Sequence, residues 1–315
     1  MTETGRRPRV ALIGECMIEL REMFDGALSR GYGGDVLNTS VYLARLMGDD
    51  ATVRFVTVLG DDPFADEMLA DWAREGIACD AVGRMAGRAT GLYVIRTDAA
   101  GERTFHYWRG QSPAREMMTD DWTDLRRAAF AADWIYLSGV TLAVIGEAGR
   151  ARLVDELAAA RAAGATVVFD GNFRPILWPD PADARVWHDR VWRLTGLALA
   201  GVEDEARIFG DATPEATVAR LAEAGIPEIV LKRGPQPVLI RRDGREMQLD
   251  VEPATEVVDT TAAGDSFNAG YLAARIRGRG PLAAAGAGAR LAVEVIRHPG
   301  AIIPAENMPA EQDGD

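Results

Sequence analysis

The segment DTTAAGDSFNAGYLAA, residues 259–274, says most about the fold. Small residues at positions 262–264 precede Asp265, and an apolar helical pattern follows it. We therefore expect a helix that starts after Asp265. Free N–H groups at such a start favour a phosphate, and the carboxylate can accept a proton from a substrate hydroxyl. Taken alone, the pattern favours a simpler explanation, a tight turn at Gly264 and a helix cap at Asp265.

Outside this segment, short β-rich runs alternate with amphipathic helical patterns such as residues 63–76 and 146–164. The β-rich runs are almost continuously apolar, which is typical of strands buried on both faces. They are RVALIG (9–14), VRFVTVLG (53–60), DWIYLSG (133–139), ATVVFDG (165–171), EIVLKRG (228–234) and the weaker LALAGV (197–202). This order predicts an α/β fold, in which a mostly parallel central sheet is sandwiched by helices.

Two stretches interrupt this rhythm. Residues 90–110 alternate like two strands around a turn at 98–101, and residues 14–35 lack a helical pattern. We expect insertions at about 15–34 and 88–112 to form a small β-rich lid over a single domain that spans 1–310. A hairpin at 237–250 should occupy the sheet edge, and residues 311–315 should form a frayed tail.

Composition excludes several functions. The formal net charge of −13 argues against nonspecific binding to nucleic acid or to an anionic membrane. No apolar run is long enough to span a bilayer, and the N-terminal residues lack a signal-peptide pattern. We therefore expect a cytoplasmic protein whose partners are small molecules.

The quoted segment resembles the C-terminal signature of the ribokinase-like (PfkB) carbohydrate kinases, and the similarity extends over nearly the whole chain. GGDVLNTSVYLARL (33–46) is similar to the family's sugar-binding segment and VLKRG (230–234) to a strand end near the nucleotide. Within the family, residues 91–109, FDGNFRPILW (169–178) and GAIIP (300–304) are most similar to the kinases of 2-dehydro-3-deoxygluconate (KDG). The resemblance implies ATP and Mg²⁺ as cofactors.

By this resemblance, Asp265 is the general base, and Ala262, Ala263 and Gly264 supply the backbone anion hole. Thr261 is a candidate phosphate-side hydroxyl, although a strand-end hydrogen bond explains it equally well. Ala262 occupies the position of the family's usual first glycine. Its methyl group is tolerated if this residue keeps a negative φ.

Gly34, Asp35 and Asn38 belong to the segment that resembles the sugar site. Glycine permits close approach of the backbone to a polyol, and the two polar side chains can pair with hydroxyls. The alternative is an ordinary loop before a helix, with Asp35 as its cap.

The predicted hairpin carries candidates for recognition of an acid. Arg109 offers a planar donor fork that matches a carboxylate, and Tyr93 and Tyr107 can close over an open-chain substrate. The alternative is a basic, aromatic hairpin exposed to solvent.

Several strand ends carry candidates for the nucleotide. By resemblance, Asn172 and Arg174 face the ATP phosphates or the sugar acid, although Arg174 could instead pair with Asp170. Lys232 and Gly234 would line the nucleotide, and the alternative for Lys232 is an ordinary exposed side chain.

A metal ligand is harder to identify. Glu205 matches the acid of the family's Asn-x-x-Glu region, but Val202 replaces its asparagine. Glu205 is therefore only a weak candidate for a magnesium ligand.

Together these features predict ATP-dependent phosphorylation of KDG to its 6-phosphate in sugar-acid catabolism of the Entner–Doudoroff type, by a homo-oligomer. One alternative is a kinase of the same family for a neutral sugar such as fructose or ribose. The other is a sugar-acid sensor without catalysis.

Overall fold

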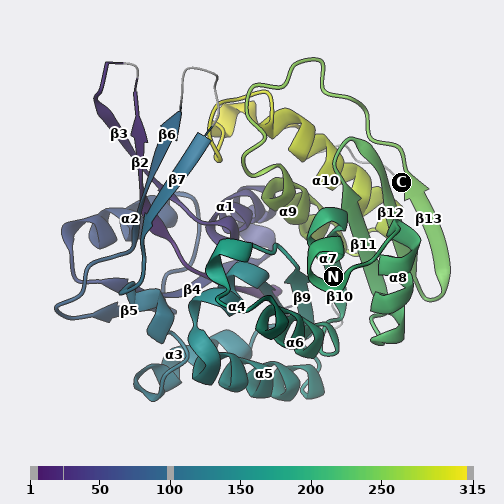
Figure 1. Ribbon diagram of the computed structural model, residues 1–315, viewed down its shortest axis with the longest axis horizontal. Coiled ribbons are helices and arrows are strands. Elements are labelled where there is room, and N and C mark those ends of the chain that lie inside the picture. Colours follow the sequence, from purple (N-terminus) through teal and green to yellow (C-terminus); the bar gives the residue numbers. More distant parts are fainter. Residues whose placement is uncertain (1–5, 24, 98–102, 311–315) are drawn as a thin grey trace.

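A nine-stranded sheet forms the centre of the computed structural model, which describes residues 6–23, 25–97 and 103–310 (Figure 1). Seven neighbouring strands run parallel, and two antiparallel strands complete one edge. In spatial order they are β13 (Arg245–Leu249), β12 (Gln236–Arg242), β11 (Glu228–Arg233), β10 (Leu197–Gly201), β9 (Thr166–Asp170), β8 (Trp134–Ser138), β1 (Arg9–Ile13), β4 (Thr52–Gly60) and β5 (Val82–Met85).

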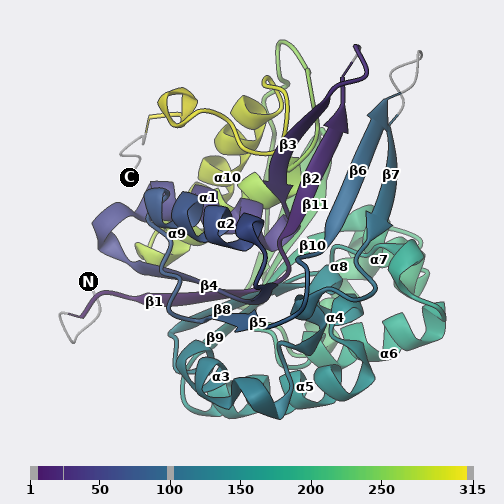
Figure 2. The same cartoon turned by 90° about the vertical axis from the view of Figure 1, so that its left-hand side faces the viewer.

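Helices cover both faces of this sheet (Figure 2). One face packs against α1 (Asp35–Met47), α2 (Pro63–Arg74), α9 (Ala263–Ile276) and α10 (Pro281–Val295). The other face carries α3 (Thr123–Phe130), α4 (Gly139–Val144), α5 (Gly146–Ala162), α6 (Pro181–Trp192), α7 (Val202–Phe209) and α8 (Pro214–Glu223). The predicted mostly parallel sheet between helices is confirmed.

Burial on both faces explains the apolar runs. In β1, Val10 and Leu12 enter one core while Ala11 and Ile13 enter the other, and all four are fully buried. Side chains that point alternately to two covered faces must all be apolar, so the strand shows no alternation in sequence.

A second, four-stranded sheet forms the lid, which stands out from the main sheet (Figure 2). Its order is β3 (Leu28–Gly33), β2 (Met17–Glu22), β6 (Leu92–Thr97) and β7 (Arg103–Trp108). Both predicted insertions therefore form strands that pair with each other. The predicted turn at 98–101 and the tail at 311–315 lie outside the described residues.

The late hairpin, β12 and β13, lies at the sheet edge as predicted. Its turn residues Asp243 and Gly244 have φ values of 50° and 79°, a conformation that suits this pair of residues. None of the helices in the described ranges is long and apolar enough to cross a membrane.

The start of α9 differs from the prediction. The helix begins at Ala263, before Asp265, because Ala262 takes the cap position in a left-handed conformation. The N–H of Ser266 donates to the Ala262 carbonyl at 2.9 Å and closes the first turn there. Asp265 therefore lies inside the first helical turn and does not cap the helix.

Candidate active site

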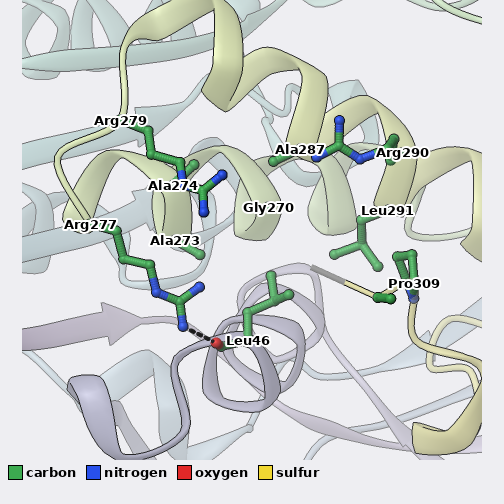
Figure 3. A pocket seen from close by; sticks show the side chains of 11 residues that line it. Leu46, Gly270, Ala273, Ala274, Arg277, Arg279, Ala287, Arg290, Leu291 and Pro309 are labelled. Carbon is green, nitrogen blue, oxygen red and sulfur yellow. Dashed lines mark hydrogen bonds between the residues drawn. The ribbon is translucent and has the colours of Figure 1, made fainter. Parts of the chain in front are cut away.

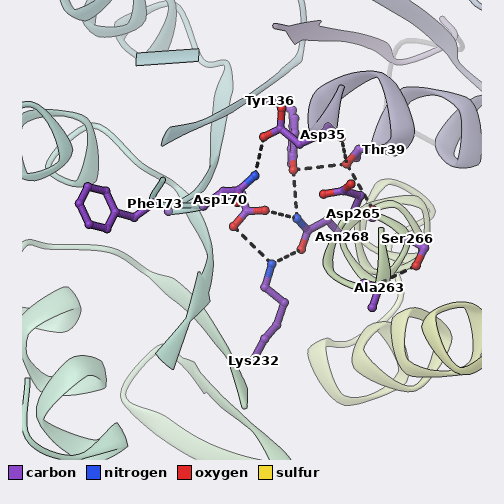
Figure 4. Close-up of polar contacts among 12 residues, drawn as sticks. Asp35, Thr39, Tyr136, Asp170, Phe173, Lys232, Ala263, Asp265, Ser266 and Asn268 are labelled. Atoms are coloured by element: carbon purple, nitrogen blue, oxygen red, sulfur yellow. Dashed lines mark hydrogen bonds and ion pairs between the residues drawn. The ribbon is translucent and has the colours of Figure 1, made fainter. Parts of the chain in front are cut away.

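Polar side chains gather where the central strands end and α1 and α9 begin (Figure 4). Asp170 is the last residue of β9, Lys232 lies near the end of β11, Asp35 opens α1 and Asp265 lies in the first turn of α9. In open α/β sheets the carboxyl ends of the strands are where ligands bind. The fold thus brings together residues that are far apart in the sequence.

Asp265 is held by Asn38, whose Nδ2 donates to the Asp265 Oδ2 at 2.8 Å. Desolvation by the surrounding protein and the negative charge of Asp35 raise the pKa of Asp265 to about 8, against the opposing effects of the Asn38 hydrogen bond and Lys232. A carboxylate with such a raised pKa is a stronger base than an exposed aspartate, which suits proton abstraction.

The loop before α9 presents backbone donors beside this carboxylate. The Ala263 N–H donates to the Thr260 carbonyl at 3.2 Å, whereas the N–H groups of Gly264 and Asp265 find no acceptor within the described ranges. These two groups are available to an anion at the helix start.

Ala262 does not keep the negative φ that its methyl group would prefer. Its φ is 61° and its ψ is 14°, which is the left-handed region. The condition for easy tolerance of the methyl group is therefore not met, because the loop keeps the left-handed backbone that a glycine would adopt. The Thr261 N–H and hydroxyl both donate to Asp259, at 2.9 and 2.6 Å, which matches the structural alternative for Thr261.

Asp35 and Asn172 meet across the same site. Asn172 Nδ2 donates to the Asp35 Oδ2 at 2.6 Å, and Asn172 has a φ of 23°. Glycine at position 34 avoids a clash within the protein, because a Cβ there would lie 2.2 Å from the Glu15 carbonyl oxygen. The close backbone approach at Gly34 is thus made by the protein itself.

The predicted carboxylate fork, Arg109, forms an ion pair with Glu15 at the base of the lid. The Glu15 side chain is 1% exposed, and its Oε1 has no hydrogen-bond partner in the part of the chain that the structure describes. The Arg109 guanidinium also lies 5.6 Å from the centre of the Tyr107 ring. Sequence reasoning missed Glu15, which is 94 residues away from Arg109.

The two lid tyrosines lie side by side, with ring centroids 5.7 Å apart. The Tyr93 hydroxyl is buried and donates to Glu19, whereas Tyr107 is 39% exposed. Burial raises the pKa of the Tyr107 hydroxyl, and the nearby charges of Arg109 and Arg174 lower it. Tyr107 thus lies near both arginines that were predicted to meet a sugar acid.

Lys232 is anchored inside the site and is not an ordinary exposed side chain. Its Nζ donates to Asn268 Oδ1 at 2.8 Å and to Asp170 Oδ1 at 3.3 Å. Gly234, by contrast, has a φ of 58° and forms the turn between β11 and β12. Asn268 was missed as a site residue, although it belongs to the segment that first indicated the fold.

Glu205 is fully buried and pairs with Arg220 at 2.7 Å. Burial raises the pKa of Glu205 to about 7, although Arg220 opposes the shift. Its other oxygen lies under Gly171, where an added Cβ would be 2.5 Å away. The side chain therefore packs close to the turn that follows β9.

The neighbouring Asp204 faces the site. Burial raises the pKa of its carboxyl, and the nearby charges of Arg174 and Lys232 lower it. Glu205, the weak candidate from the sequence, pairs with Arg220, whereas the residue before it, Asp204, lies near Arg174 and Lys232.

A separate cavity of about 50 Å³ lies between α9, α10 and the end of α1 (Figure 3). Small residues such as Gly270 and Ala273 line it, and the Arg277 Nη2 donates to the Leu46 carbonyl at 2.6 Å beside it. It shares no residue with the polar cluster described above.

Comparison with known proteins identifies the family of the chain. The model of the pfkB family of carbohydrate kinases matches residues 7–308. The 2-dehydro-3-deoxygluconokinase of Dickeya dadantii strain 3937 is 44% identical over 308 residues, which cover 96% of this chain and 98% of that protein. The protein of the same name from Escherichia coli K12 is 42% identical over 309 residues and covers 96% and 99%.

Among solved structures, a putative ribokinase II from Escherichia coli in complex with ATP and Mg²⁺ has a TM-score of 0.82. The match covers 96% of each chain at 20% identity. At that identity it shows a shared ribokinase-like fold.

Proposed function

The chain belongs to the pfkB family of carbohydrate kinases, and from this premise we propose that it transfers the γ-phosphate of ATP to the 6-hydroxyl of KDG. The identity of more than 40% with two 2-dehydro-3-deoxygluconokinases over nearly the whole chain supports this substrate. The observation that carries the chemistry is the position of Asp265, with its raised pKa, beside free N–H groups at the start of α9.

Asp265 acts as the general base. It takes the proton of the terminal hydroxyl while that oxygen attacks the γ-phosphorus, and the bond from this phosphorus to the bridging oxygen of ADP breaks. Charge that develops on the transferred group is stabilised by the N–H groups of Gly264 and Asp265 and by the helix dipole. Asn38 keeps the carboxylate in place through its 2.8 Å hydrogen bond.

Magnesium would arrive with the nucleotide. No three His, Cys, Asp or Glu side chains in the described ranges converge as metal ligands. Mg²⁺ is often held by one or two carboxylates together with substrate phosphates, and Asp204 and Asp170 lie at the Lys232 end of the site. These residues fit an ion that neutralises phosphate charge when bound, and we propose them in place of Glu205, which pairs with Arg220.

Arg109 and Arg174 are the proposed groups for the substrate carboxylate. Arg109 keeps further N–H groups beyond the one given to Glu15, since a guanidinium has five. Tyr107, which lies near both arginines, would cover the open-chain acid when the lid closes.

We further propose that residues 1–310 act as one domain in a cytoplasmic homo-oligomer. The lid exposes large apolar side chains, which in a monomer would remain in water. Their exposed fractions are 45% for Met23, 55% for Leu28, 41% for Phe105 and 63% for Trp108. Contact between lids of two copies would cover them.

A coupled ADP-release assay over KDG, its galactose-series epimer, fructose and ribose tests the substrate assignment. We expect kcat/KM to be highest for a sugar acid. Equal or higher values with fructose or ribose would indicate a neutral-sugar kinase, and no ADP release with any sugar or sugar acid would indicate a sensor.

A further inference from the structure

Lys232 is the only lysine in the chain, and its ammonium group lies between two fixed oxygen atoms (Figure 4). It donates to Asn268 Oδ1 at 2.8 Å and to Asp170 Oδ1 at 3.3 Å, and the side chain is 16% exposed. An ammonium group has three N–H donors. Two are used by these acceptors, and the third is left for a ligand.

The ammonium group is directed toward the start of α9. Its Nζ lies 3.7 Å from the position that a Cβ on Gly264 would occupy. The positive end of the helix dipole and the free N–H of Gly264 are at the same place. Side chain, backbone donor and helix dipole therefore all favour one negatively charged group at this point.

Asn268 fixes the position of the Lys232 ammonium group. It is fully buried, and its Nδ2 donates to Asp170 Oδ2 at 2.7 Å and to the Tyr136 hydroxyl at 3.0 Å. Because the amide nitrogen has two oxygen acceptors, the amide oxygen must face Lys232. The amide thus orients both Asp170 and the ammonium group.

We propose that Asn268 is a positioning residue that, together with Asp170, holds the Lys232 ammonium group against the phosphate chain of the nucleotide. Lysine has a flexible four-carbon stem, so without Asn268 only Asp170 would restrain it. The ammonium group would then be held by fewer contacts and would lie beside Gly264 for less of the time. The inference rests on the proposed function for the identity of the phosphate donor.

The kinetic test compares Asn268→Ala with Tyr271→Phe. Both side chains are fully buried on α9, but the Tyr271 hydroxyl donates to Glu228 at 2.6 Å and does not touch Lys232. Loss of a hydrogen bond to a charged group should lower kcat/KM for ATP roughly 10- to 100-fold in Asn268→Ala. The KM for KDG should change less than about 3-fold, and Tyr271→Phe should change neither by more than that. An equal effect of both variants on ATP would overturn the proposal.

A second test uses the single lysine and needs no turnover. An amine-reactive reagent can modify only Lys232 and the N-terminal amine, and peptide mass mapping separates the two. ATP should slow modification of Lys232 in the wild type, whereas KDG alone should not. In Asn268→Ala, or in the milder Asn268→Ser, modification without ATP should be faster and protection by ATP weaker.

Unchanged modification of Lys232 at saturating ATP would contradict the inference, even if KDG is phosphorylated. Protection by ATP together with faster modification in Asn268→Ala would support it, even if KDG proves not to be the acceptor. The proposal and the substrate assignment can therefore fail separately.

Discussion

Ala262→Gly should stabilise the protein, although the change removes a side chain and adds backbone freedom. Ala262 has a φ of 61° and a ψ of 14°, and the left-handed conformation costs an L-residue about 1–2 kcal/mol relative to glycine. Glycine loses about 0.4–1 kcal/mol more chain entropy on folding. The difference predicts a gain of roughly 0.5–1 kcal/mol in the free energy of unfolding.

Ala163→Gly is the matched control. Ala163 also lies at a helix end, but its φ is −80°, so no backbone strain is relieved. This variant should lose about 0.4–1 kcal/mol. Equilibrium urea unfolding measures both, with the midpoint shifted upward for Ala262→Gly and downward for Ala163→Gly. If both variants are destabilised to the same extent, Ala262 stores no strain and the reasoning is refuted.

Other predictions concern the lid base and the catalytic carboxylate. Arg109→Leu should raise the KM for KDG about 10-fold or more, because a charge-assisted contact is lost. The KM for a neutral sugar should barely change, and equal effects on both would refute the role of Arg109 in binding the carboxylate. Glu15→Gln should lower the free energy of unfolding by about 3 kcal/mol, because it leaves the Arg109 charge unpaired. In urea unfolding, the double variant with Arg109→Leu should recover part of that loss. kcat/KM should rise with pH and level off above about 8, because Asp265 must be deprotonated to accept the proton and its pKa is raised to about 8; a flat profile from pH 6 to 9 would contradict this.

Much of the fold could be predicted because the central strands are buried on both faces. Val10 to Ile13 alternate between two covered faces, so the apolar run itself indicates a parallel sheet between helices. The lid could be located because its strands break the strand–helix rhythm. The start of α9 could not, since the left-handed conformation of Ala262 depends on the whole loop and alanine does not signal it.

The candidate site was also predicted only in part. Asp35, Asn38, Asn172, Lys232 and Asp265 were predicted, and the structure brings them together in one polar cluster. Their placement follows from local signals at strand ends and helix starts. The partners of these residues depend on contacts between distant segments, which one sequence does not reveal.

Glu15 and Asn268 illustrate such partners. Glu15 meets Arg109 only where the lid joins the main sheet. Asn268 follows Asp265 by three residues, next to the apolar Phe267. An asparagine among apolar helix residues is a signal that the sequence does contain. Its role becomes clear only from its contacts with Asp170 and Lys232 in the structure.

Asp265 is the proposed base for the phosphorylation of KDG. The most direct measurement is the turnover of wild type and Asp265→Asn with saturating ATP and KDG, with the phosphate ester identified by mass. Asp265→Asn should lower kcat roughly 10²- to 10⁴-fold while ATP still protects Lys232 from modification. A variant that keeps kcat within about 3-fold of wild type would contradict the account, because catalysis by a base contributes far more than that.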